Sequence, residues 1–144
     1  MTEIAFHFGA PDKRGYALRL IRKAVGSGAK LWVLGDGPLL QELDSALWSL
    51  TETEFLTHCL VDATEDILSR SSVVLVPAHV QHSHPEFPIL VNLSSQMPSG
   101  FEVYTRVIEV VSTDDVDKDS ARNRWKAYTQ LGYAISRHDL NLRS

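Results

Sequence analysis

The chain has 144 residues, of which 44% are hydrophobic and 22% are charged, a composition typical of a globular protein rather than of a disordered or fibrous one. Its formal net charge of −4 repels a phosphate backbone, so nucleic-acid binding would require a local basic patch. The single cysteine excludes an internal disulfide and a zinc site built on several cysteines, which indicates a reducing compartment.

No targeting or membrane signal is found in the sequence. The segment from Met1 to Phe6 lacks the basic and apolar regions of a signal peptide, and no apolar run approaches the ~18 residues that a membrane span requires. We therefore expect a soluble, cytoplasmic protein without membrane contact. The length fits one domain, residues 1–144, with residues 136–144 as a C-terminal tail.

The first half of the chain alternates short apolar runs with helical patterns. Ile4 to Phe8 is expected to form a strand, and apolar residues between Lys13 and Val25 recur at helical spacing before a glycine-rich stop. Leu31 to Leu34 predicts a second strand, and a second helix begins near Pro38. The apolar arc of that second helix is wider than one face, which leaves part of it for a partner.

The middle of the chain continues the alternation. A short extended segment is expected at Phe55 to Leu60 and a brief helix at Thr64 to Ser69. The runs Val73 to Val76 and Ile89 to Leu93 are apolar and rich in β-branched residues, as in strands that are covered on both faces.

The last third predicts a strand from Arg106 to Val111 and a long helix from Thr113 to Leu131, which Gly132 ends. A short helix at Gly100 to Tyr104 precedes them, and an edge strand at Tyr133 to Ile135 follows. Strands that alternate with helices indicate an α/β fold: a Rossmann-like domain with a mainly parallel sheet.

The loop Gly35-Asp36-Gly37 lies between a strand and a helix, where backbone amides attract anions. It lacks the third glycine of a dinucleotide site and the Gly-Lys-Ser/Thr of a Walker loop, and Asp36 would repel a phosphate. A tight turn is the favoured interpretation. Nucleotide or phosphate binding at Gly35 to Gly37 stays open as the alternative function.

Other candidate chemistry has ordinary explanations. A closed metal site needs about four ligands, so the three histidines of one polar loop are interpreted as solvated: His79, His82 and His84. An acidic run at the start of the last helix complements the helix dipole rather than holding magnesium: Asp114, Asp115, Asp117 and Asp119. We therefore expect no metal, no cofactor and no enzymatic activity.

The segment from Lys118 to Tyr133 concentrates basic and aromatic residues on one helix. One stripe contains Lys118, Arg122 and Trp125, with Lys126 beside it. Cations that flank an indole can bind an acidic peptide with an aromatic end, but a solvated helix face with a half-buried Trp fits the residue types equally well. Ala127, Tyr128 and Leu131 are expected to face the core, with Ala121 and Arg124 at its margin.

The sequence resembles the chi subunit of bacterial DNA polymerase III holoenzyme over most of its length. The similarity lies in the order of four segments: Asp44-Ser45-Ala46-Leu47-Trp48, Phe55-x-x-His58, Pro88-Ile89-Leu90 and Ala121-Arg122-Asn123-Arg124-Trp125-Lys126-Ala127-Tyr128. The first and last segments are the most specific. The loop from Pro77 to Glu86 and the region from Val61 to Ser72 depart from the family pattern.

The resemblance implies an accessory subunit of the clamp loader that uses a Rossmann-like fold without nucleotide chemistry. It implies a partner in single-stranded DNA-binding protein, whose acidic C-terminal tail ends in a phenylalanine carboxylate. By position, Arg122, Trp125 and Lys126, with Lys118 upstream, would hold that tail, and the family usually has tyrosine where Trp125 stands. Trp48 and Phe55 would belong to the surface for the psi subunit or a competing helicase. Direct binding of single-stranded DNA is disfavoured by the net charge of −4.

Overall fold

The computed structural model describes residues 2–54, 57–79 and 86–140. Its strands are β1 (Glu3–Ala10), β2 (Leu31–Gly35), β3 (His58–Leu60), β4 (Val73–Pro77), β5 (Ile89–Asn92), β6 (Arg106–Ser112) and β7 (Ile135–Asp139). Its helices are α1 (Lys13–Gly26), α2 (Gly37–Glu54), α3 (Glu65–Arg70), the short 3₁₀ helix η1 (Phe101–Val103) and α4 (Asp115–Gln130).

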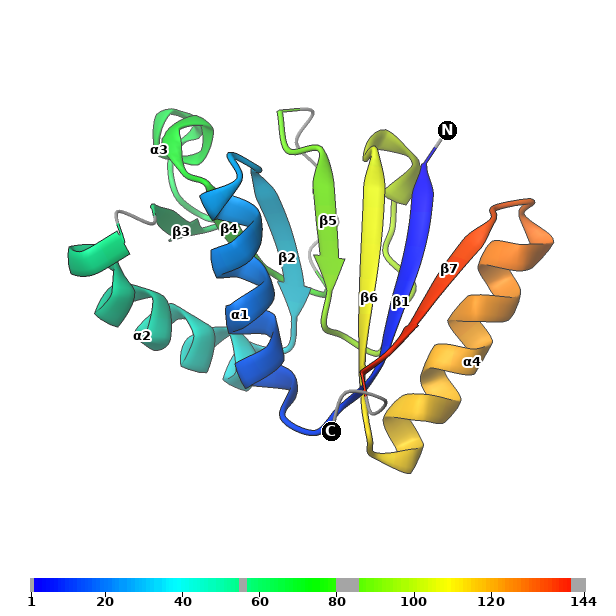
Figure 1. Ribbon diagram of the computed structural model, residues 1–144. Helices are drawn as coiled ribbons and strands as arrows, with labels where there is room; N and C mark the ends of the chain where they lie inside the picture. The colour runs from blue at the N-terminus through cyan, green and yellow to red at the C-terminus, as the bar shows by residue number, and fades with distance from the viewer. Residues whose placement is uncertain (1, 55–56, 80–85, 141–144) are drawn as a thin grey trace.

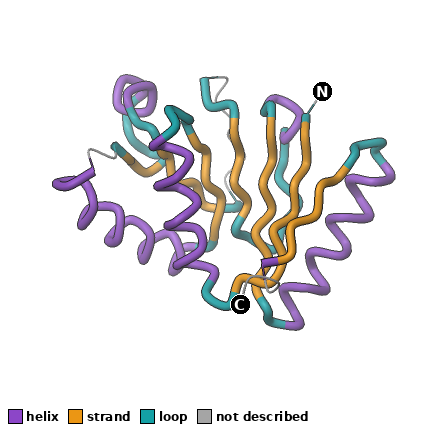
Figure 2. The backbone as a smooth tube through the Cα atoms, viewed as in Figure 1, coloured by secondary structure: helices purple, strands orange, loops and turns teal. Residues whose placement is uncertain are grey.

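The described strands form one sheet of seven strands in the order β3-β4-β2-β5-β6-β1-β7, and every pairing within it is parallel. Figures 1 and 2 show this sheet as the central layer, with helices along it. Parallel neighbours require crossover connections, which the helices supply. The predicted α/β fold with a mainly parallel sheet is confirmed.

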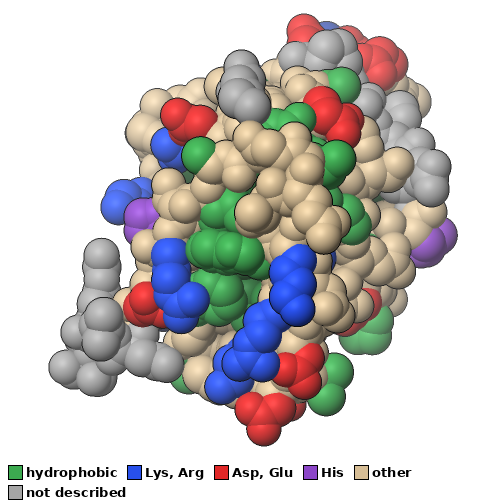
Figure 3. All heavy atoms as spheres, turned by 90° about the vertical axis from the view of Figure 1, so that its right-hand side faces the viewer, with side chains coloured by type: hydrophobic (Ala, Val, Ile, Leu, Met, Phe, Trp, Pro, Cys, Tyr) green, Lys and Arg blue, Asp and Glu red, His purple; other side chains and the backbone are tan. Residues whose placement is uncertain are grey.

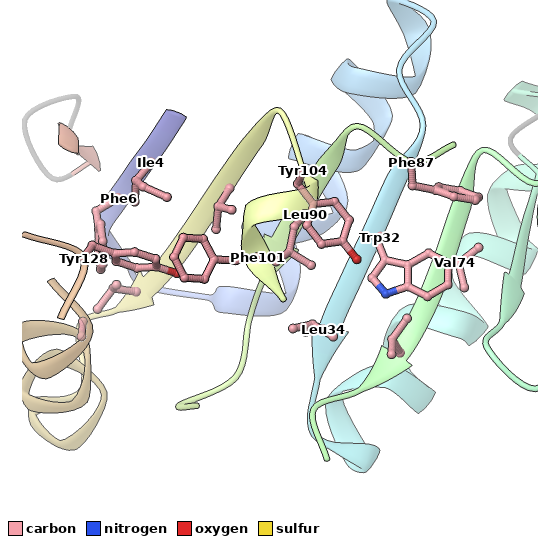
Figure 4. Close-up of a cluster of buried hydrophobic side chains, with 14 of the residues drawn as sticks. Ile4, Phe6, Trp32, Leu34, Val74, Phe87, Leu90, Phe101, Tyr104 and Tyr128 are labelled. Carbon is pink, nitrogen blue, oxygen red and sulfur yellow. The ribbon is translucent and has the colours of Figure 1, made fainter. Parts of the chain in front are cut away.

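Two apolar clusters cover the two faces of the sheet. Helices α1 and α2 pack on one face through buried side chains that include Ile21 and Leu43. Helix α4 and η1 pack on the other face, where Tyr128 of α4 contacts both Phe6 of β1 and Phe101 of η1. Figure 4 shows this second cluster extending to Trp32. Burial of such aromatic side chains contributes about 1.5–3 kcal/mol each, so this cluster fixes α4 against the sheet.

The C-terminal region differs from the sequence expectation in two ways. The edge strand β7 extends to Asp139, well into the segment that was expected to be a tail. It pairs with β1 from Ile4↔Ile135 to Phe8↔Asp139, so backbone hydrogen bonding to β1 orders a segment that is polar in sequence. Leu131, expected in the core, is 59% exposed, because α4 ends at Gln130 and the chain turns away at Gly132 with a positive φ of 91°.

Within the part of the chain that the structure describes, none of the helices combines the length and the apolar character needed to cross a bilayer.

Candidate protein-binding site on helix α4 and strand β7

Helix α4 begins at an acidic cap. The side chain of Asp114 accepts a hydrogen bond from the backbone N–H of Asp117 at 3.2 Å, which satisfies one of the free amides of the first turn. Asp117 in turn accepts from the N–H of Ser112 and pairs with Lys13 at 2.8 Å. The acidic run therefore starts and anchors the helix, as its position predicted.

A buried polar network sets the rotation of α4. Nε of Arg124 lies 3.0 Å from Oε1 of Glu109 on β6, and the two side chains are 3% and 0% exposed. The hydroxyl of Tyr128 donates to Oε2 of Glu109 at 2.8 Å, and Nδ2 of Asn92 donates to both oxygens. Burial raises the pKa of Glu109, and the guanidinium of Arg124 opposes that rise. Since this face points inward, the opposite face of α4 points outward.

Three aromatic rings lie together where α4 crosses the end of β1, and we call them the aromatic floor: Phe6, Phe8 and Trp125. The Trp125 ring is 5.1 Å from Phe6 and 6.1 Å from Phe8, centroid to centroid. Phe6 is fully buried, whereas Phe8 and Trp125 are only partly buried. The partly buried rings can accept a further apolar or aromatic group from outside.

Cationic side chains of α4 border the aromatic floor, and we call them the α4 cations: Lys118, Arg122 and Lys126. Arg122 and Lys126 are exposed, and Nη1 of Arg122 lies 2.7 Å from Oδ1 of Asp119. Lys118 pairs at 3.6 Å with Asp115. Both are exposed pairs within one helix, worth about 0–1 kcal/mol, so an incoming carboxylate can compete with them. The predicted cations and Trp125 therefore lie on the same face of α4.

The sequence interpretation missed a fourth cation at the aromatic floor, which comes from β7 rather than from α4. The guanidinium carbon of Arg137 on β7 lies 4.4 Å from the centroid of the Phe8 ring, and Nε of Arg137 lies 2.9 Å from Oδ2 of Asp139. Figure 3 shows a hydrophobic patch on the face that carries α4 and β7, with Lys and Arg side chains on both sides of it. The sequence offered no signal for this cation, because Ser136 to Asp139 are all polar and show no apolar alternation.

This arrangement is suited to binding rather than to bond breaking. Guanidinium and ammonium groups pair with carboxylates, and the partly buried rings beside them can accept an apolar side chain. In the described residues no group of three or more His, Cys, Asp or Glu side chains is placed to hold a metal ion. Of the three loop histidines, His79 is exposed, while His82 and His84 lie outside the described residues.

The second surface predicted from the sequence centres on Trp48 of α2. Its side chain is 61% exposed, and its ring lies 4.8 Å from that of His58 on β3. Nε2 of His58 is 3.0 Å from Oδ1 of Asp44, one helical turn before Trp48, so the indole rests on a fixed imidazole. Phe55 lies outside the described residues. Trp48 belongs to α2 at the β3 edge of the sheet, whereas α4 lies at the β7 edge.

The Gly35–Gly37 loop is a tight turn whose own carboxylate, Asp36, caps the helix that follows. Oδ1 of Asp36 accepts a hydrogen bond from the N–H of Leu39 at 2.9 Å, so a carboxylate occupies the N-terminus of α2. A Cβ added at Gly35 would come within 3.1 Å of Leu40, which explains a small residue there without a ligand. The geometry favours the structural interpretation of this loop.

A separate cavity of ≈ 390 Å³ lies between α1 and the opposite face of the sheet. His7 of β1 lines it together with His138, and their rings are 4.7 Å apart. His7 also shares a short hydrogen bond with the hydroxyl of Tyr16. Burial, then His138 and Arg106, lowers the pKa of His7 to about 4. The ring is therefore neutral at physiological pH.

Comparison with solved structures bears on the fold alone. The C-terminal domain of a variant of S. cerevisiae Dbp5, bound to Gle1 and IP6, matches with a TM-score of 0.66 at 11% identity, over 96% of this chain and 90% of that one. Dbp5 bound to RNA and ADP BeF3 matches with a TM-score of 0.64 at 13% identity, over 96% of this chain and 41% of that one.

Sequence relatives are more specific. DNA polymerase III subunit chi of Pseudomonas aeruginosa is 30% identical over 125 residues, which cover 86% of this chain and 84% of that protein. The subunit chi of Haemophilus influenzae is 27% identical over 122 residues, which cover 78% and 82%. The family model described as DNA polymerase III chi subunit, HolC, matches residues 1–136. The resemblance carried by the Trp48 and Arg122 segments is confirmed, and the chain belongs to the DNA polymerase III chi subunit family.

Proposed function

We propose that this chi-family chain is a non-catalytic accessory subunit of the clamp loader that binds the acidic C-terminal tail of single-stranded DNA-binding protein. The observation that carries the proposal is the position of exposed Arg122 and Lys126 next to partly buried Trp125 on the outward face of α4. Such a tail offers carboxylates for the cations and a terminal phenyl ring for the aromatic floor.

Electrostatics support this kind of ligand. The chain as a whole carries −4, so it repels an anion in general, and binding depends on the local field of the α4 cations. A short acidic peptide can lie within that field without approaching the rest of the surface, whereas a long phosphate backbone cannot. The same local field steers the tail toward the site and makes the affinity fall with salt.

We further propose that the Trp48 surface connects the chain to the loader through psi, or binds a competing helicase. A large, 61% exposed indole that is held in place by His58 has the character of an interface anchor. Exposed Leu60 on β3 and Ile67 on α3 add apolar area at the same end of the sheet. This surface and the α4 site would let one chain hold two partners.

Fluorescence polarisation with a labelled acidic peptide that ends in a free phenylalanine carboxylate tests the tail proposal. The Arg122→Ala variant should bind at least tenfold more weakly, because it loses a charge-assisted contact, while its thermal unfolding stays unchanged. Arg70→Ala is the matched control, since Arg70 is also an exposed helical arginine paired with an acidic neighbour, on α3. Equal affinity of the wild-type protein and the Arg122 variant would refute the proposal.

A further inference from the structure

Arg137 is placed to act on the same ligand from the side opposite α4. Phe6 pairs in register with Arg137 and Phe8 with Asp139, and strand alternation puts these four side chains on the face that α4 covers. The guanidinium carbon lies 4.4 Å from the Phe8 centroid, close enough for a cation–π contact. Arg137 thus contacts the aromatic floor while its side chain remains 56% exposed.

Arg137 and the α4 cations lie next to different rings of the aromatic floor. Arg122 and Lys126 flank Trp125 on its own helix, three residues before and one after. Arg137 instead covers Phe8, whose centroid is 6.1 Å from that of Trp125. In an extended peptide each residue advances about 3.3–3.6 Å, so a step of this size corresponds to about two residues. A carboxyl terminus bound beside Trp125 would therefore place an earlier residue near Arg137.

We propose that Arg137 is a specificity-determining residue that pairs with the acidic side chains that precede the terminal aromatic residue of the ligand, while the α4 cations hold the terminal carboxylate. This inference rests on the proposed function and adds a second cationic side to the site. Asp139 accepts hydrogen bonds from Nε of Arg137, which leaves the two Nη groups to donate to a carboxylate of the ligand. The site then selects a peptide in which acidic residues precede a C-terminal aromatic residue. A peptide that has only the acidic residues, or only the aromatic C-terminus, binds more weakly.

A comparison of two labelled peptides tests this assignment. The first has three aspartates before a short spacer and a C-terminal phenylalanine, and the second has asparagines in place of the aspartates. Arg137→Gln should weaken binding of the aspartate peptide about fivefold and leave binding of the asparagine peptide unchanged. Arg122→Gln should weaken binding of both peptides, because both keep the terminal carboxylate.

Arg70→Gln controls for the loss of one positive charge, because Arg70 is an exposed arginine on α3, away from the site. Arg137→Lys should recover part of the affinity for the aspartate peptide, since the charge remains and the planar contact with Phe8 does not. If Arg137→Gln weakens both peptides alike, or neither, the assignment of Arg137 is overturned while the proposed function stands. If the wild-type protein binds neither peptide, both proposals are overturned.

Discussion

Arg124 and Glu109 form an ion pair inside the protein core, with Nε of Arg124 3.0 Å from Oε1 of Glu109. Their neighbours Tyr128 and Asn92 complete the hydrogen bonding of the carboxylate. Burial of a charge is unfavourable unless the charge is paired, so the net contribution of this pair to stability is small. Its main effect is to fix the orientation of α4 on the sheet. Arg122 and Arg124 are two positions apart, yet Arg124 is buried and Arg122 is exposed.

Removing one member of the pair should destabilise the protein strongly. Arg124→Met leaves the carboxylate of Glu109 buried without its counter-charge, which costs about 3–5 kcal/mol of unfolding free energy. Adding Glu109→Gln to that variant should restore part of the loss. Urea unfolding measures both, and Arg122→Met, expected within about 0.5 kcal/mol of the wild-type value, is the control. A stability of Arg124→Met equal to that of the control would contradict this account.

Asp119→Asn should strengthen binding of the acidic tail peptide. The carboxylate of Asp119 lies 2.7 Å from Arg122 and competes with the ligand for it. An exposed pair of this kind is worth about 0.2–1 kcal/mol, so the affinity should rise about two- to fivefold. Asp66→Asn is the control, because Asp66 pairs with Arg70 in the same manner on α3. Unchanged or weaker binding by the Asp119 variant would show that Arg122 is not the competing group.

His7 should make the protein less stable in mild acid. Its pKa is about 4 in the folded state and 6.5 in the unfolded state, so between these pH values the unfolded chain binds more protons. The stability that His7 contributes is complete above pH 6.5 and is lost as the pH falls toward 4. Discounted for the partly exposed ring, the loss at pH 5 is about 1 kcal/mol. Urea unfolding of the wild-type protein and His7→Asn at pH 7 and pH 5 checks this, and equal losses in the two proteins would disprove it.

Trp48→Ala should affect one partner and not the other. The side chain is 61% exposed, so the free energy of unfolding should change by less than about 1 kcal/mol. Binding of a purified psi subunit should weaken at least tenfold, as expected for an interface tryptophan, and affinity for the tail peptide should not change. Val103→Ala, at a residue with 57% exposure, serves as the control in the same calorimetric titration. Psi binding that survives the Trp48 change would remove the indole from that interface.

The central strands were predictable because their chemistry is local. The run Val73 to Val76 is apolar and β-branched, and β4 spans it. Strand β7 was predicted too short, since Ser136 to Asp139 is polar and its pairing with β1 depends on contacts between residues more than one hundred positions apart. Periodicity cannot reveal an edge strand whose outer face meets solvent.

The proposed binding site was half predictable for the same reason. Helical spacing placed Arg122, Trp125 and Lys126 together on α4, and the structure does so as well. Phe8 and Arg137 come from two strands that meet only in the folded sheet, so no spacing rule connects them to the helix. Arg124 was expected at the margin of the core, and the reason for its full burial, Glu109 within an apolar strand, is visible only in three dimensions.

The order of the strands has a mechanical consequence. His58, which supports Trp48, is on the first strand of the sheet, and Arg137 is on the last, with six inter-strand intervals between them. At about 4.8 Å for each interval, the two edges are about 29 Å apart. Hydrogen bonds between the intervening strands make the sheet stiff. If the two proposed partners bind, each therefore leaves the opposite edge of the sheet sterically clear, and tension applied through one of them is transmitted along the sheet to the other.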